Sequence, residues 1–325
     1  MKVCIYGAGA IGGWIGVGLA QAGCPLNVVA RGATLDALQR DGLSLLRGDQ
    51  RTRVTVHAVA DPAELGVQDL VVIAVKAPAL PAVAARIAPL LGPDTIVLTA
   101  MNGVPWWFLQ GGFGGPLAGT QLEAVDPGGK IDAAIPARHV IGGVVHASCS
   151  LDGPAVVRHH FGNGLIIGEP SGAATPRAQE LEALLKQAGF EARLSARIQK
   201  DVWYKLWGNM TVNPISALTG ATTDLILNDE LVRGFISTIM LEAREIGERI
   251  GVPIAESPED RHAVTRRLGA FKTSMLQDVE AHRPVELDAL VSVVRELGQR
   301  AGVATPFTDA LLGLARLQAR QLGLY

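Results

Sequence analysis

Residues 2–13, KVCIYGAGAIGG, decide the fold of this chain. The stretch opens with a short apolar run containing β-branched residues, which is typical of a buried parallel strand. The glycine spacing G-x-G-x-x-G follows at once, and an apolar helical pattern then extends from Trp14 to Ala22. A strand, this spacing and a helix in direct succession are the usual signature of a dinucleotide-binding turn. The sequence therefore predicts a parallel sheet with a nucleotide site near residue 10.

Each glycine of the motif has its own physical role. Gly7 allows a tight turn out of the strand, Gly9 leaves room for a pyrophosphate, and Gly12 lets the helix pack closely on the strand. The N–H groups at the helix start, together with its positive dipole end, then hold the phosphates. The alternative is a glycine-rich turn that binds no ligand. The predicted cofactor-binding residues of this turn are Gly7, Ala8, Gly9, Ala10, Ile11 and Gly12.

The residue after the second strand bears on the choice between NAD and NADP. This strand is expected over Leu26–Ala30, and Arg31 follows it. An acidic residue at this point binds the ribose 2′-hydroxyl of NAD, whereas an arginine accommodates a 2′-phosphate. Because no acid stands here, we predict NADP(H) as the cofactor. The alternative is that Arg31 is only a solvated surface residue.

Two further strand ends carry polar residues. The expected strand Leu70–Val75 ends at Lys76, and Thr95–Thr99 leads into Asn102 and Gly103. Ligands of open parallel sheets bind beyond the carboxyl ends of the strands, so Lys76 is expected near a cofactor phosphate unless it is a surface lysine. Asn-Gly after a strand is usually only a turn. At this edge, the amide of Asn102 could also lie beside the nicotinamide or the substrate.

The periodicity of the sequence changes near residue 195. Before this point the expected elements are helices over Ala33–Arg40, Ala79–Leu91 and Thr175–Ala188, a hairpin of Leu43–Leu46 with Val54–Val59, and strands over Val140–Ser148, Ala155–His160, Leu165–Gly168 and Glu191–Leu194. After it only helices are expected, over Ile198–Ala217, Asp229–Ile250, Pro258–Met275, Leu287–Ala301 and Pro306–Leu322. We therefore predict an α/β fold with a Rossmann-like NADP-binding domain over 1–195 and an all-helical substrate and dimerisation domain over 196–325.

Composition excludes several classes of protein. The 325 residues are enough for two domains, and the net charge of −2 gives no indication of nucleic-acid or anionic-membrane binding. The three scattered cysteines form neither a disulfide framework nor a metal motif, so we expect a reducing compartment and no metal site. With no room for a signal peptide before the first strand and no membrane-spanning apolar run, a soluble cytoplasmic protein is expected. The apolar helices are compatible with a homodimer, although packing within one subunit explains them equally.

The segment Pro105–Pro136 is long and rich in glycine, and it begins with Trp106, Trp107 and Phe108. A loop of this length is usually functional or mobile. Its aromatic residues either wall an apolar pocket or form a lid beside the active site, or they anchor the loop to the body of the protein. Both interpretations stay open at this point.

Residues 201–214, DVWYKLWGNMTVNP, place three polar side chains on one stripe of a helix. Lys205, Asn209 and Asn213 are spaced at i, i+4 and i+8. Such residues are costly to bury among large aromatic side chains unless they are paired. In a polar cleft the amides would contact a carboxylate, and a lysine desolvated by the neighbouring tryptophans would have a lowered pKa and give a proton to a carbonyl oxygen. The alternative is that Lys205 forms an ordinary i,i+4 salt bridge with Asp201 and that the two asparagines are surface residues.

Two motifs near residue 280 have ordinary structural explanations. Ser274 is expected to cap the short helix that begins SMLQD. Glu286 is expected in the first turn of the following helix, where a carboxylate is favoured. On their own, these residues indicate no function.

Taken together, the motifs resemble those of the ketopantoate reductase family, the 2-dehydropantoate 2-reductases. The resemblance extends over nearly the whole chain, and the order and spacing agree. The matching motifs are GAGAIG, Arg31, Lys76 after IAV, Asn102-Gly103, WYKLWGNMTVNP, SMLQD and Glu286-Leu287-Asp288. The family pattern implies a Rossmann domain, a helical C-terminal domain and an NADPH-filled cleft between them.

The resemblance also assigns roles to individual residues. The lysine of the family's KLxxNxxxNP helix is the proton donor, and that lysine is Lys205 here. The positions that match substrate contacts are Asn209, Asn213 and Ser274, with Asn102 bridging substrate and nicotinamide. The positions that match contacts with the cofactor or within the ternary complex are Lys76, Asn102, Ser148 and Glu286.

Three features depart from the family pattern. Phe271 replaces an asparagine three residues before Ser274, and Thr223 stands where a second substrate-side asparagine is common. The loop with Trp106 and Trp107 is longer than in compact members. These changes favour a bulkier or more apolar 2-oxo acid. We therefore expect NADPH-dependent reduction of a 2-oxo acid to a 2-hydroxy acid, with 2-dehydropantoate as the first candidate. The alternatives are a bulkier 2-oxo acid, an imine, or a non-catalytic NADP-binding sensor.

Overall fold

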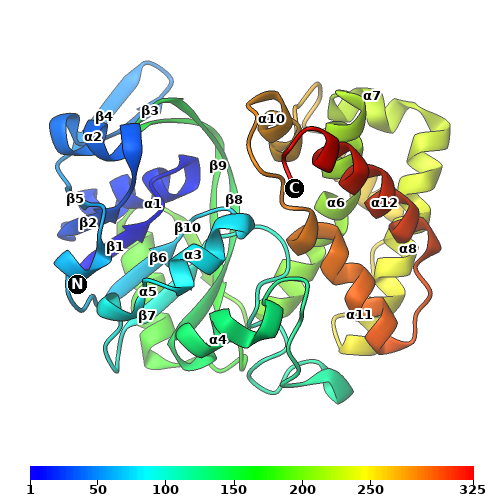
Figure 1. Cartoon of the computed structure of the whole chain (residues 1–325), viewed down its shortest axis with the longest axis horizontal. Coiled ribbons are helices and arrows are strands. Elements are labelled where there is room, and N and C mark those ends of the chain that lie inside the picture. Colours follow the sequence, from blue (N-terminus) through cyan, green and yellow to red (C-terminus); the bar gives the residue numbers. More distant parts are fainter. The chain divides into compact units, whose positions relative to one another are not determined.

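The computed structural model describes all residues from Met1 to Tyr325, and the chain forms two compact units. Unit 1 comprises Met1–Met101 and Lys130–Ile198, and unit 2 comprises Asn102–Gly129 and Gln199–Tyr325. Figure 1 shows a sheet with helices in unit 1 and mainly helices in unit 2. The predicted α/β class is confirmed. Residues 102–129, however, belong to the helical unit and not to the predicted continuous domain 1–195.

The sheet of unit 1 is built around strand β1 (Val3–Tyr6), which lies between β2 (Leu26–Val29) and β6 (Leu70–Ile73) in parallel. The parallel pairing continues from β6 to β7 (Ile96–Thr99) and from β2 to β5 (His57–Val59). Strands β1, β6 and β7 are buried along their whole length, as expected for strands covered on both faces. The strand order reverses on the two sides of β1, which is where ligands of such sheets bind.

The remaining strands extend this sheet. A long antiparallel hairpin of β8 (Val140–Gly153) and β9 (Val156–Gly168) replaces the three short strands predicted there. The sequence predicted a break between the strands Ala155–His160 and Leu165–Gly168. Register shifts near Ser148, which pairs with Phe161, let the pairing of β8 with β9 continue through that break. Strand β10 (Glu191–Leu194) pairs with β9, and on the far side of β9 lie β3 (Leu43–Arg47) and β4 (Gln50–Val54). The full order is β4-β3-β9-β8-β7-β6-β1-β2-β5.

The predicted edge hairpin is wrong in its second strand. Strand β3 (Leu43–Arg47) pairs with β4 (Gln50–Val54), which lies immediately after a tight turn at Gly48 with φ +56°. The expected partner, Val54–Val59, instead contains β5, which joins the parallel sheet beside β2. The turn at Gly48 therefore pairs β3 with the residues that directly follow the turn, and the more hydrophobic segment Val54–Val59 comes too late in the chain to be the partner.

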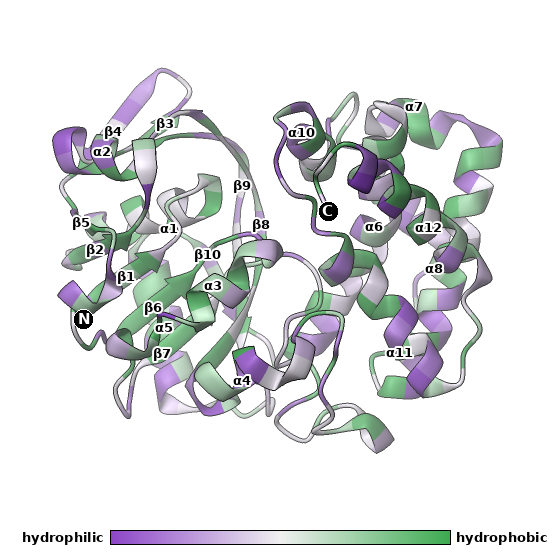
Figure 2. Ribbon diagram, viewed as in Figure 1, coloured by the Kyte–Doolittle hydropathy of each residue, from purple (hydrophilic) through white to green (hydrophobic).

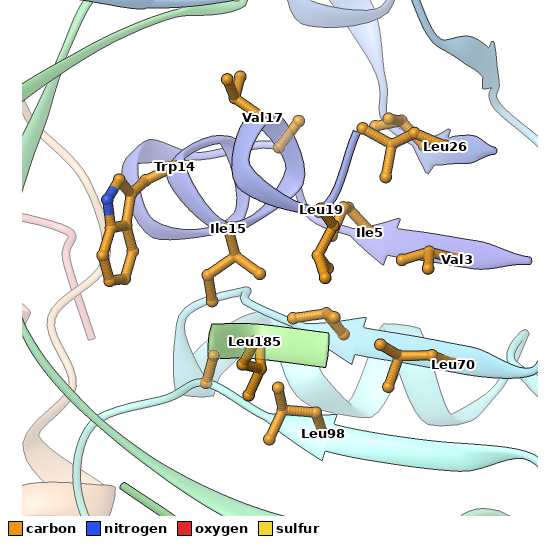
Figure 3. Packing of buried hydrophobic residues seen from close by; sticks show 14 of the residues in the cluster. Val3, Ile5, Trp14, Ile15, Val17, Leu19, Leu26, Leu70, Leu98 and Leu185 are labelled. Atoms are coloured by element: carbon orange, nitrogen blue, oxygen red, sulfur yellow. The ribbon is translucent and has the colours of Figure 1, made fainter. Parts of the chain in front are cut away.

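Helix α1 (Ala10–Gln21) packs its buried residues on the sheet in the main core of unit 1, as Figure 3 shows. Trp14 and Ile15 are fully buried there with Ile5 of β1 and Leu185 of α5 (Pro176–Gln187). The ring of Trp14 meets Phe190 edge to face, with centroids 4.7 Å apart. The glycine motif thus stands at the start of a helix that the core holds firmly.

The other helices of unit 1 are shorter. The predicted helix Ala79–Leu91 is mostly wrong, because only α3 (Leu80–Ala84) is α-helical and 3₁₀ turns precede and follow it. A proline stands in the first turn of each of these three pieces, and each proline interrupts the preceding hydrogen-bond ladder. The remaining helices are α2 (Gly32–Asp41) and α4 (Lys130–Ala134). Figure 2 shows α2 and β4 as hydrophilic and the central strands as hydrophobic.

Unit 2 is built mainly from helices of unequal length. No helix in the chain combines the length and apolarity needed to cross a membrane. The α-helices are α6 (Ile198–Thr219, starting one residue before the unit), α7 (Thr223–Asn228), α8 (Glu230–Ile250), α9 (Pro258–Arg266), α10 (Ser274–Glu280), α11 (Val293–Ala301) and α12 (Pro306–Gln321). A π-helical turn, η7 (Asp288–Ser292), leads into α11.

The single helix predicted over Pro258–Met275 is two helices. α9 ends at Arg266, and the chain passes through Gly269, with φ +64°, before α10 begins at Ser274. Thr273, not Ser274, is the N-cap of α10, because its hydroxyl accepts a hydrogen bond from the Leu276 N–H at 3.2 Å. The predicted capping role of Ser274 is therefore wrong, and its hydroxyl is left for another partner.

The aromatic residues after Asn102 anchor their segment in unit 2. The side chains of Trp106, Trp107 and Phe108 are at most 2% exposed. The Phe108 ring lies 6.0 Å from Trp203 of α6 and 5.3 Å from Phe113. Of the two interpretations left open by the sequence, anchoring is the one that fits this burial, and it explains why residues 102–129 follow the helices.

Candidate functional site

The glycine motif forms the expected turn at the start of α1. Gly7 has φ +97°, and a Cβ atom on Gly12 would lie 2.1 Å from the carbonyl oxygen of Gly7. The turn and the close helix–strand packing therefore both require glycine. Gly9 is the N-cap of α1 without a side-chain hydrogen bond, and a Cβ there would meet nothing within 4 Å. The space beside Gly9 at the start of α1 is therefore open, as the approach of a pyrophosphate to a helix N-terminus requires.

A cavity of about 370 Å³ extends from this turn within unit 1. Gly7, Ala8 and Gly9 line it, together with Arg31 after β2 and Thr34 in α2. The Arg31 side chain is exposed and makes no ion pair, whereas the second arginine of the lining, Arg86, is 3.3 Å from Asp61. The structure thus brings the glycine turn and Arg31 to one cavity, with a guanidinium available for an anionic group.

Two predicted cofactor contacts of unit 1 lie outside the lining of this cavity. Lys76 is half-buried three residues after the end of β6, where it precedes a 3₁₀ turn. Ser148 is half-buried in β8, opposite Phe161 at the irregular part of the hairpin. Lys76 follows β6 and Ser148 lies within β8, and the contacts of both residues with a cofactor stay predictions.

Unit 2 holds the second group of predicted residues, centred on Lys205. Its Nζ donates a hydrogen bond to Oδ1 of Asn102 at 2.8 Å. Asn102 is fixed by the backbone that follows it, since the Val104 N–H donates to the carbonyl of Ala289 at 2.9 Å. A Cβ on Gly103 would lie 2.4 Å from that same carbonyl, so this approach to η7 is possible only for glycine. The Asn-Gly pair therefore positions the partner of the lysine.

Burial lowers the pKa of Lys205 from 10.5 to about 8. The carboxylate of Glu286 opposes this shift, and the guanidinium of Arg261 adds to it. Glu286 is itself buried, 6% exposed, and stands just before η7 and outside the helix in which it was expected. With a pKa near 8, Lys205 is mostly protonated at pH 7 and gives up its proton readily, which suits a general acid.

The two asparagines continue the stripe of Lys205 along α6. Asn213 is buried, and its Nδ2 donates to Oγ of Ser274 at 3.5 Å. Asn209 lies between Asn213 and Lys205 on the same helix and is half-buried. Two separate contacts thus lie along one row of α6, from Lys205 to Asn102 and from Asn213 to Ser274, and Asn209 stands between them in the row.

Two of the three departures from the family pattern, Thr223 and Phe271, contact one another. The Thr223 N–H donates to the carbonyl of Phe271 at 3.0 Å, and the Thr223 hydroxyl donates to the carbonyl of Gly269 at 2.6 Å. Thr223 is 1% exposed, so its side chain supports the 269–271 segment from inside and is turned away from solvent. Replacement of both asparagines therefore exchanges polar side chains for a packed connection between α7 and α10.

One residue of this cluster was missed by the sequence reasoning. Arg261 of α9 lies against α6, where a Cβ on Gly208 would be 2.4 Å from its Nη2. The only sequence signal was a glycine inside a helix, which often marks the close approach of another group. Nothing in the sequence connected Gly208 with an arginine so far along the chain.

Comparison with known proteins decides the family. The family model "Ketopantoate reductase PanE/ApbA" matches residues 3–106, and "Ketopantoate reductase PanE/ApbA C terminal" matches residues 197–319. A 2-dehydropantoate 2-reductase from Mesorhizobium japonicum is 47% identical over 326 positions, covering 100% of both chains. The chain belongs to the ketopantoate reductase family.

Solved structures agree with this family. A crystal structure from Ralstonia solanacearum MolK2, described as a candidate ketopantoate reductase, is 56% identical with a TM-score of 0.96, covering 100% of this chain and 99% of the other. A ternary structure of D-mandelate dehydrogenase with NADH and anilino(oxo)acetate shares the fold, at 21% identity and a TM-score of 0.86 over 100% of both chains. The predicted family and its class of NAD(P)H-dependent oxidoreductases acting on CH–OH donors are confirmed.

The glycine motif gives a test with a matched control. We expect Gly12→Ala to lower the free energy of unfolding by about 1–3 kcal/mol, because its methyl group overlaps the Gly7 carbonyl. Gly9→Ala should leave the unfolding midpoint unchanged and weaken dinucleotide binding about tenfold or more, since its methyl group enters only the open space. Urea titration and calorimetric binding of NADPH measure the two effects. Equal nucleotide affinity in Gly9→Ala and the parent would contradict the assigned phosphate site.

Proposed function

We propose that this protein reduces 2-dehydropantoate to pantoate with NADPH, and that Lys205 is the general acid. The observation that carries the proposal is the desolvated Lys205, with a pKa of about 8 and a hydrogen bond to Asn102, on a helix that also bears the two asparagines. Membership of the ketopantoate reductase family and the name of the Mesorhizobium japonicum relative support this substrate.

In this proposal, the residues of unit 2 have different roles in carbonyl reduction. The Lys205 ammonium gives its proton to the carbonyl oxygen as negative charge develops there. Asn102 holds the ammonium in one direction, and the buried charge of Glu286 keeps it from deprotonating earlier. The amides of Asn209 and Asn213 and the hydroxyl of Ser274 orient the substrate by hydrogen bonds.

The cofactor is held by unit 1 in this proposal. The N–H groups at the start of α1 bind the pyrophosphate, and Arg31 binds the 2′-phosphate that distinguishes NADPH from NADH. When bound, the reduced nicotinamide supplies the hydride for the carbonyl carbon. Lys76, Ser148, Asn102 and Glu286 are proposed as further contacts with the cofactor or within the ternary complex.

A bulkier 2-oxo acid is the second candidate substrate. Phe271 and Thr223 replace polar residues that the family pattern places on the substrate side, and they pack together here. A fold relative, D-mandelate dehydrogenase, is described with an aromatic oxo acid ligand, anilino(oxo)acetate. Imine reduction and a purely sensory role remain alternatives, but a sensor has no need for a desolvated proton donor.

The substrate is tested by NADPH oxidation at 340 nm with a panel of 2-oxo acids. We expect 2-dehydropantoate to give the highest kcat/KM. A higher value for an aromatic or larger aliphatic 2-oxo acid would favour the second candidate, and addition of an amine to the panel detects an imine reductase. Tight binding of NADPH without turnover of any member would contradict an enzymatic role.

Removal of Lys205 tests the mechanism. We expect Lys205→Ala to lower kcat by about 10²–10⁴, with unchanged NADPH affinity, because the general acid is lost. Reduction needs the protonated lysine, so kcat of the parent should fall as the pH rises through about 8, and the fall should be absent in the variant. Lys200→Ala, an exposed lysine on the same helix, is the control and should behave like the parent. A near-normal kcat in Lys205→Ala would show that another group donates the proton.

Cofactor preference is tested at Arg31. Arg31→Ala should raise KM for NADPH about tenfold and leave KM for NADH unchanged, because only NADPH offers a phosphate to the guanidinium. Arg53→Ala, which removes an exposed arginine of β4, should change neither value. The assignment fails if both cofactors are affected equally by Arg31→Ala.

A further inference from the structure

The guanidinium of Arg261 is desolvated without a carboxylate partner. Its Nη1 donates to Oγ1 of Thr265 at 3.3 Å, and the group lies 5.7 Å above the ring of Tyr204. Its Nε is buried and has no hydrogen-bond partner. Burial is strong enough to lower even the pKa of this guanidinium. A permanently charged group in such surroundings is costly unless an anion meets it.

The chain makes room for this charge beside the reactive lysine. Gly208 of α6 is the point of contact, since a Cβ there would lie 2.4 Å from Nη2 and 2.7 Å from Cζ of Arg261. Tyr204 and Gly208 are one turn apart and border the stripe that Lys205 and Asn209 occupy on the same helix. The guanidinium therefore lies along the edge of the row of proposed substrate-binding residues.

The positive charges of Arg261 and Lys205 repel one another. Arg261 contributes to the lowered pKa of Lys205, so its charge is felt at the proton donor. The nearby acid, Glu286, acts on Lys205 and makes no ion pair with Arg261. An anion that enters the cluster would therefore stabilise both cations, and it would compensate a charge that the protein itself leaves uncompensated.

We propose that Arg261 binds the carboxylate of the 2-oxo acid, next to the carbonyl that Lys205 protonates. This inference rests on the proposed function, since every candidate 2-oxo acid carries a carboxylate one bond from its carbonyl carbon. The planar guanidinium suits a carboxylate better than an ammonium would, because it presents parallel N–H donors. The residue thereby selects acids over neutral ketones and holds the carbonyl within reach of the lysine.

The test compares Arg261→Met with Arg267→Met, which removes an exposed arginine beyond the end of α9. Arg261→Met should raise KM for the 2-oxo acid about 10- to 100-fold and change kcat much less. It should weaken binding of oxamate, an unreactive 2-oxo acid mimic, by the same factor in calorimetry with NADPH present. The fall of kcat at high pH should also move upward, because removal of the positive charge raises the pKa of Lys205. Arg267→Met should change none of these values.

Further variants keep the test decisive. Arg261→Lys keeps the charge and should recover part of the oxamate affinity, and Gly208→Ala should lose it because the new methyl group displaces the guanidinium. If Arg261→Met does not fold, these two variants provide the answer. Unchanged KM and oxamate affinity in Arg261→Met or Gly208→Ala would overturn the inference while leaving 2-oxo acid reduction intact. Arg261-dependent oxamate binding without turnover of any 2-oxo acid would instead overturn the proposed function and keep the carboxylate site.

Discussion

The contact that the helical unit depends on is the hydrogen bond from Lys205 to Asn102. An ammonium in a desolvated position is acceptable only if fixed polar groups surround it. Here the amide oxygen of Asn102 accepts a hydrogen bond from the ammonium at 2.8 Å, and the carboxylate of Glu286 opposes deprotonation of Lys205. The pKa of about 8 is the balance between two effects that favour the neutral amine, burial and the charge of Arg261, and the carboxylate of Glu286, which favours the ammonium.

Several elements of unit 2 are arranged so that this contact can form. The chain leaves β7 at Thr99 and enters the helical unit at Asn102, where Gly103 lets it approach the carbonyl of Ala289. That carbonyl belongs to η7, a π-helical turn, and such turns often occur at functional sites. The aromatic residues that follow then bind the segment firmly to the helices. Asn102 is consequently held from both sides along the chain.

Local patterns predicted much of this arrangement, and long-range contacts supplied the rest. The G-x-G-x-x-G turn and the i, i+4, i+8 stripe were predictable because strand–turn–helix and helix geometry fix them over a few residues. The membership of residues 102–129 in unit 2 was not, because a glycine-rich loop has no period that reports where its aromatics are buried. The cap of α10 was assigned one residue late, since Thr273 and Ser274 carry equivalent hydroxyls. The position of Arg261 in the cluster was not predicted, because it depends on a contact with Gly208, a residue distant in sequence.

The same long-range contacts bear on how substrate recognition is distributed in this chain. Thr223 and Phe271 stand where the resemblance to the family implies two asparagines, and the hydrogen bond from the Thr223 N–H to the Phe271 carbonyl occupies both of these groups. Neutral amides are thereby lost on the side of α7 and α10. On the side of α9 the cluster has a guanidinium instead, and it lies directly on α6. A guanidinium binds a carboxylate strongly whatever the rest of the substrate is, whereas amide side chains distinguish substrates by the position of their hydroxyl groups. In the proposed site, Arg261 therefore anchors the acid end of the substrate, and shape and apolar contact constrain the distal end.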